Sequence, residues 1–178
     1  SIHDLVILDI NARNYSGNGV TFQISTAGGA FHYLSIRHVT VPVSDKHLIL
    51  IGGRLQAGAS QGIVLTENVL GVGQYPVMST GGRNNCAFGQ ISPKDMFDAC
   101  WKGYQATANL LVGGADGWPH GNRSVKNLKA LGYGGAGSDA NELAAWKLPA
   151  SNQNHAAVDG ADYGADIPKI QAVIAGRE

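Results

Sequence analysis

Short apolar segments recur along the chain at a nearly constant spacing, and clusters of turn-forming residues separate them. Copies of one segment start at Ile7, Ile36 and Leu65, two successive steps of 29 residues. A fourth copy starts at Ala106, after a step of 41 residues. Each segment is too short to bury its own apolar side, so neighbouring copies must cover one another. The spacing predicts an all-β fold of stacked parallel coils, a solenoid whose fourth step carries an insertion.

Seven ranges rich in β-branched and aliphatic residues are predicted strands, because such side chains suit a pleated surface that is buried on one side. They are Leu5–Ala12, Val20–Ile24, Tyr33–Val41, His47–Ile51, Gly62–Val72, Tyr75–Met78 and Tyr104–Val112. Glycine-rich clusters between them predict bends. Asn68 and Asn109 share one position of the repeat, where stacked amides can hydrogen-bond from coil to coil. We interpret this pair as a structural ladder.

The repeat ends near Gly113, which divides the chain into two regions. Residues 1–113 are expected to form the coils, with an insertion at about 80–103. Residues 114–178 lack the repeat, and we expect them to form loops and short helices that pack on the solenoid and cap it.

Three short helices are predicted in and after the insertion. The run Ser92-Pro93-Lys94-Asp95 has an N-cap, a proline at the first helical position and an acidic third residue. Ser124–Leu131 precedes a glycine and is the second candidate. A final helix follows Asp166, with one apolar face formed by Ile167, Ile170, Val173 and Ile174. We expect this helix to cover the open last coil, because an exposed strand edge invites aggregation.

Charge and composition exclude several classes of protein. The chain has 13 basic and 13 acidic residues and no lysine or arginine run, so we expect no partner among nucleic acids or anionic membranes. No apolar run approaches the roughly 20 residues that span a bilayer. The 25 glycines indicate many tight turns and leave little of the chain for helices.

Two cysteines, Cys86 and Cys100, both lie inside the insertion. A disulfide between them would tie down a segment that has few other contacts. The alternative is a pair of unrelated buried thiols, and the spacing is not that of metal ligands. A disulfide predicts an oxidising compartment, so the protein is expected to be secreted or periplasmic.

Longer motifs carry a resemblance to a known family. Three runs carry it: Asn14-Tyr15-Ser16-Gly17-Asn18-Gly19, Ser35-Ile36-Arg37-His38-Val39-Thr40 and Val158-Asp159-Gly160-Ala161-Asp162-Tyr163-Gly164-Ala165-Asp166. They resemble the C-terminal part of bacterial secreted right-handed parallel β-helix proteins, the pectate-lyase-like group. The resemblance implies a right-handed parallel β-helix that binds or degrades an extracellular polysaccharide. The alternative is a non-catalytic structural or adhesive segment of a larger secreted protein.

Proteins of this group usually have further coils ahead of the region that this chain resembles. The resemblance therefore implies missing N-terminal coils or a partner that pairs edge to edge with the first coil. The paired aspartates with a Gly-His-Gly motif, typical of polygalacturonases, do not occur in this sequence. Whether the chain is an enzyme stays open at this point.

One column of the repeat could carry chemistry. The register places Asp9, His38 and Glu67 at the same position, with Arg37 in the neighbouring column. A carboxylate beside an imidazole suits general acid–base catalysis, and a guanidinium can neutralise a uronate carboxylate. The chemistry would be that of a polysaccharide lyase or a glycoside hydrolase. The alternative is ordinary stabilisation by opposite charges on neighbouring strands.

Aromatic residues are the candidates for substrate binding. Trp118, Tyr75 and Trp101 could stack on sugar rings, with Trp118 the most exposed of them, or could pack under loops.

No metal or other cofactor is expected from the sequence. Asp9, His38 and Glu67 are disfavoured as ligands, because the outer two coils would be about 9.6 Å apart. Asp159, Asp162 and Asp166 offer oxygen ligands for Ca²⁺ but lack the spacing of a calcium loop. Turn capping explains these three aspartates as well.

Overall fold

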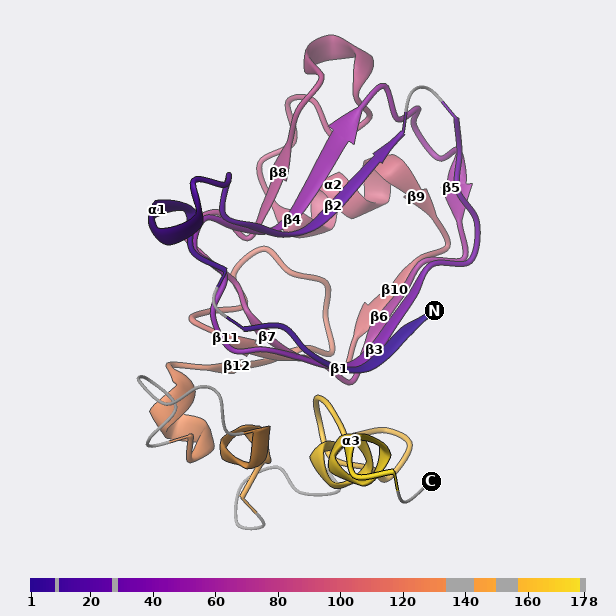
Figure 1. The fold of residues 1–178 in the computed structure, drawn as a ribbon. Coiled ribbons are helices and arrows are strands. Elements are labelled where there is room, and N and C mark those ends of the chain that lie inside the picture. The colour runs from indigo at the N-terminus through magenta and orange to yellow at the C-terminus, as the bar shows by residue number, and fades with distance from the viewer. Residues whose placement is uncertain (9, 27–28, 134–142, 150–156, 177–178) are drawn as a thin grey trace.

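The computed structural model describes residues 1–8, 10–26, 29–133, 143–149 and 157–176. Most of the regular structure is β, in parallel sheets, with few helices (Figure 1). The largest sheet contains β1 (Ile2–Val6), β3 (Ser35–Val41), β6 (Val64–Thr66), β7 (Val69–Gly71), β10 (Gln105–Thr107), β11 (Leu110–Val112) and β12 (Arg123–Val125). The two smaller sheets contain β2 (Val20–Thr26), β4 (His47–Gly53) and β8 (Val77–Ser79), and β5 (Ser60–Gln61) and β9 (Trp101–Lys102).

Strands from successive passes of the chain lie one above another. The order β2-β4-β8 forms one sheet, β5 pairs with β9, and the largest sheet has the order β10-β6-β3-β7-β11-β12 with β1 on β3. In Figure 1, β3, β6 and β10 overlap closely, and β2, β4 and β8 lie side by side. Apolar side chains from the sheets fill the space between them, where Val39, Ile49 and Leu111 are almost wholly buried.

The pairing register confirms three of the four repeat copies. Ile36 and Ala106 both pair with Leu65, as the steps of 29 and 41 residues predict. The first copy is displaced, because Ile2 and not Ile7 pairs with Ile36. The Ile7 N–H instead donates to the Thr40 carbonyl, 2.9 Å away, so Ile7 lies beside the end of β3 and not beside Ile36 as the repeat implied.

Two predicted strands are each divided by a bend. The range 62–72 separates into β6 and β7 at Glu67, and the range 104–112 separates into β10 and β11 at Ala108. Both bend residues have left-handed backbone, with φ of 63° and 54°. The first predicted strand was wrong beyond Val6: Asn11 accepts hydrogen bonds from the next turn and caps the short helix α1 (Ala12–Tyr15).

The insertion forms a short 3-10 turn, η1 (Gly82–Asn84), and helix α2 (Pro93–Cys100). The predicted N-cap is confirmed, because the Ser92 side chain accepts a hydrogen bond from the Asp95 N–H. Phe97 of this helix is wholly buried and joins the main core.

The predicted disulfide between Cys86 and Cys100 is present. It closes a loop with a sequence separation of 14, and replacing both cysteines by alanine should lower the free energy of unfolding by about 3 kcal/mol. Urea titration followed by circular dichroism measures the effect. Reductant should destabilise the wild-type chain similarly and leave the double variant unchanged; equal stability of the oxidised and reduced wild-type chains would contradict the prediction.

The C-terminal elements lie outside the largest sheet: η2 (Leu128–Leu131), η3 (Leu143–Trp146) and α3 (Ile167–Ile174) (Figure 1). The helix predicted at 124–131 was only partly right, because Arg123–Val125 pairs with β11 as strand β12. Asp166 caps α3 as predicted, accepting a hydrogen bond from the Lys169 N–H.

Helix α3 covers a flank of the fold. Its buried residue Ile167 packs in a cluster with Trp146 and Ala165, against which Val6 and Leu8 also pack. This position beside the beginning of the chain differs from the expected cap on the last coil. Val173 and Ile174 remain 57% and 75% exposed, so the predicted apolar face is only half covered. None of the helices in the described ranges is long and apolar enough to cross a lipid bilayer.

Candidate functional site

Three side chains project from neighbouring bends of the largest sheet. Asp4, His38 and Glu67 have left-handed backbone, with φ of 50°, 49° and 63°. The β1–β3 register places Asp4 opposite His38, and the β3–β6 register leads from His38 to Glu67. Left-handed backbone costs a non-glycine residue roughly 1–2 kcal/mol, so these side chains are held at the bends against a local preference.

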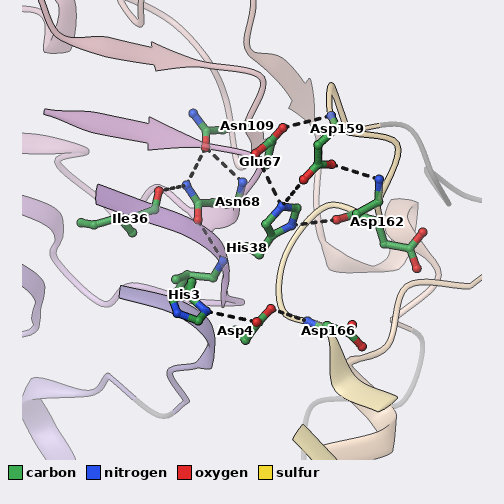
Figure 2. A network of polar contacts seen from close by, with 12 residues as sticks. His3, Asp4, Ile36, His38, Glu67, Asn68, Asn109, Asp159, Asp162 and Asp166 are labelled. Carbon is green, nitrogen blue, oxygen red and sulfur yellow. Dashed lines mark hydrogen bonds and ion pairs between the residues drawn. The ribbon is translucent and has the colours of Figure 1, made fainter. Parts of the chain in front are cut away.

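His38 lies between two carboxylates (Figure 2). Its Nε2 atom is 2.8 Å from Asp159 Oδ2 and 3.5 Å from Glu67 Oε2. Its Nδ1 atom is 3.1 Å from the Asp162 carbonyl oxygen. A carbonyl oxygen only accepts hydrogen bonds, so Nδ1 carries a proton and donates it. The ring is therefore fixed at both nitrogens.

Glu67 is the buried member of this group. Its side chain is only 6% exposed. Oε1 accepts a hydrogen bond from the Asp159 N–H at 3.2 Å, whereas Oε2 has no hydrogen-bond partner in the described part of the chain. Beyond these contacts, Oε2 has the ion pair with His38. The cost of removing this carboxylate oxygen from water is therefore not fully offset by hydrogen bonds.

The segment 157–166 completes the site by packing across the bends. The Gly164 N–H donates to the Glu67 carbonyl at 2.8 Å, and the Ala165 N–H donates to Thr40 Oγ1 at 2.9 Å. Gly164 has φ of 78°, and a Cβ atom there would lie 2.4 Å from Thr40 Oγ1. Only glycine allows this close approach.

Asp159 is ionised under ordinary conditions. Burial raises its pKa, but hydrogen bonds from the Ala161 N–H and from His38 outweigh that effect, so the pKa of Asp159 lies below its usual value. Its side chain is 47% exposed. The group therefore offers solvent a carboxylate that is already charged.

A cavity of about 410 Å³ opens beside His38. Its wall includes the carboxyl residues Asp4, Asp162 and Asp166, and the cation Lys147. The volume falls within the range of small-molecule sites. Carboxylates outnumber lysine in this wall, so the cavity favours ligands that donate hydrogen bonds over ligands that carry negative charge.

A ladder of asparagines supports the bends from inside. Asn68 Nδ2 donates to Asn109 Oδ1 at 2.8 Å, and Asn109 Nδ2 donates to Asn122 Oδ1 at 2.8 Å (Figure 2 shows the first pair). Asn68 Oδ1 also accepts from the Val39 N–H. The predicted ladder is confirmed and extends by one member. Asn122 was missed because it follows Asn109 by 13 residues, a step that the repeat does not contain.

The predicted catalytic column is only partly assembled. His38 and Glu67 lie together as the register implied, and Asp9 lies outside the described residues. The structure places Asp4 in β1, opposite His38 of β3. Arg37 is exposed and pairs in register with Thr66, and it does not belong to the wall of the cavity. The second carboxylate beside His38 comes from Asp159, which the repeat could not reveal.

Two of the three predicted sugar-stacking residues are buried. Trp101 and Trp118 are 2% and 6% exposed and pack in the main core. Phe97 stacks on Trp101 with ring centroids 4.5 Å apart, and this burial corrects the expectation that the two tryptophans face a ligand. Tyr75 is 53% exposed, but its ring lies near His47 and it does not line the cavity beside His38.

The three aspartates considered for Ca²⁺ have separate roles. Asp159 contacts His38, Asp162 provides a carbonyl to the same ring, and Asp166 caps α3. The described group whose atoms could share an ion is instead His38, Glu67 and Asp159, with ligand atoms within 4.8 Å of one another.

Comparisons with protein-family models, with curated proteins and with solved structures gave no match. The function is therefore inferred from the chain's own geometry and chemistry.

Proposed function

We propose that the chain is a right-handed parallel β-helix module of a secreted protein, and that it binds a neutral polysaccharide in the cavity beside His38. The parallel stacking of β2, β4 and β8, and of β3, β6 and β10, supports the fold. The disulfide supports an oxidising compartment.

The cavity carries the proposal for a ligand. Sugars present many hydroxyl groups, and charged carboxylates are strong acceptors for them. Asp162 and Asp166 line the cavity together with the partly exposed imidazole of His38. The excess of carboxylates would repel a uronate, which makes a neutral glycan the better ligand and makes β-elimination the less suitable reaction.

The same site has groups that could also cleave the bound glycan. The partly exposed His38 ring lines the cavity and can exchange a proton with a ligand there, and the ionised Asp159 lies beside the same ring. Glu67 is too deeply buried to touch a sugar. Any hydrolysis would therefore depend on His38 and Asp159, with Glu67 positioning the ring.

A structural role is the alternative, and one observation favours it. Both ring nitrogens of His38 already contact the segment 157–166, through the Asp162 carbonyl and the Asp159 carboxylate. In this alternative, His38, Glu67 and Asp159 only hold the segment 157–166 against the sheet.

Binding to neutral and acidic polysaccharides tests the proposal. Asp162→Ala should weaken binding to a neutral glycan at least about tenfold, the loss expected for one hydrogen bond to a charged group. Asp116→Ala, an exposed aspartate outside the cavity wall, is the matched control. Affinity electrophoresis gives the dissociation constants, and reducing ends released from the same samples report cleavage. Absence of binding to every glycan would favour the structural role.

A further inference from the structure

We infer that His38, Glu67 and Asp159 together bind one divalent transition-metal ion, such as Zn²⁺. The three residues come from two neighbouring bends and from the segment that crosses them (Figure 2). An imidazole nitrogen and two carboxylate oxygens are the ligand types that such ions accept.

One pair of ligand atoms already has the separation that a small tetrahedral ion needs, and the Asp159 side chain must move to provide the third ligand. Zinc bonds of about 2.0–2.1 Å place neighbouring ligand atoms about 3.4 Å apart. His38 Nε2 and Glu67 Oε2 are already separated by 3.5 Å. Asp159 Oδ2 is closer to Nε2, at 2.8 Å, and its half-exposed side chain has room to withdraw.

The buried oxygen of Glu67 points independently to a cation. Its side chain is 94% buried, and Oε2 is directed at His38 with no hydrogen-bond partner in the described part of the chain. An ionised carboxylate in such a place is costly unless a positive charge lies against it. A bound ion would provide that charge at an oxygen whose one polar contact among the described residues is the 3.5 Å ion pair with His38.

The surroundings orient the ligands as metal sites require. The Nδ1–H group of His38 donates to the Asp162 carbonyl, so the Nε2 lone pair becomes available to an ion once Nε2 releases the proton that it donates to Asp159. The Asp159 N–H holds Glu67 Oε1, so Oε2 is the oxygen that is turned toward the ring. Such outer contacts fix both the tautomer and the direction of the ligands.

The ligand set argues for a transition metal over calcium. Calcium takes six to eight oxygen ligands and rarely an imidazole. With three protein ligands, a tetrahedral ion keeps one open position. Because His38 also lines the cavity, that position would face a bound molecule; only this last point rests on the proposed glycan site.

Calorimetry tests the inference without any glycan. The chain is dialysed against a chelator and then titrated with Zn²⁺, and Co²⁺ is added separately to record visible absorption from the bound ion. We expect one ion per chain. Glu67→Gln, which keeps the shape of the side chain, should weaken Zn²⁺ binding at least about tenfold, and so should Asp159→Asn. His120→Gln removes an exposed histidine and should leave the Zn²⁺ affinity unchanged.

Circular dichroism confirms that each variant is folded, and Asp159→Asn serves if Glu67→Gln fails to fold. Absence of saturable Zn²⁺ binding, or wild-type affinity in the folded variants, would overturn the inference. Glycan binding is measured separately on the same preparations. Loss of glycan binding alone, with Zn²⁺ binding intact, would contradict only the proposed function.

Discussion

Replacing Asn68 by alanine is expected to lower the free energy of unfolding by about 3–5 kcal/mol. The side chain is wholly buried and satisfies three groups: it accepts from the Val39 N–H and donates to the Ile36 carbonyl and to Asn109 Oδ1. Its removal leaves the Val39 N–H and the Ile36 carbonyl in the interior without this partner, whereas Asn109 Oδ1 keeps the hydrogen bond from the Asn68 N–H; each unsatisfied group costs roughly 1–3 kcal/mol. Urea unfolding followed by circular dichroism measures the change.

Asn127→Ala is the matched control for this variant. Asn127 is exposed, and its side chain accepts one hydrogen bond, from the Ala130 N–H at the start of η2. Its loss should cost about 1 kcal/mol, as for other helix caps. If the two variants were equally stable, the asparagine ladder would contribute no more than a surface cap, and the prediction would be wrong.

Phe97→Ala should destabilise the fold by about 3–5 kcal/mol, the range for deleting a buried aromatic ring. Phe97 stacks on Trp101 and meets Trp118 edge to face, with centroids 4.5 and 5.7 Å apart. The substitution would open a cavity between the insertion and the sheets, since neither indole can fill the space alone. Tryptophan fluorescence during urea unfolding reports the midpoint.

Phe88→Ala controls for the same residue type within the same insertion. Phe88 is 52% exposed, so the loss of its ring should change the free energy of unfolding by less than about 1 kcal/mol. A large effect at Phe88, or a small effect at Phe97, would mean that the aromatic group around α2 is not a principal source of stability.

The repeat was predictable because strand pairing follows spacing. Ile36, Leu65 and Ala106 occupy one column, as their steps imply, and the Asn68–Asn109 contact follows from it. The first coil defeated the same reasoning. Strand β1 begins at Ile2, and a second apolar group near Ile7 follows it. The two groups are similar in composition, so the repeat was matched to the wrong one.

Two of the three residues of the candidate site could be predicted in the same manner. His38 and Glu67 are neighbours through the β3–β6 register, whereas Asp159 reaches His38 across 121 residues of chain. No periodic pattern connects His38 with Asp159, because the segment that carries Asp159 is irregular. The burial of Trp101 and Trp118 could not be predicted from the repeat either, because it depends on how α2 turns Phe97 into the core.

The segment 157–166 has a consequence for the order of folding. Neighbouring strands join residues 29 positions apart, as in the hydrogen bond that the Val39 N–H donates to Asn68 Oδ1, whereas His38 and Asp159 close a loop of 121 residues. Closing a longer loop costs more chain entropy, and distant contacts form more slowly. The stacked strands are therefore expected to assemble first, and His38, Glu67 and Asp159 would come together only when the segment 157–166 settles against a sheet that is already built.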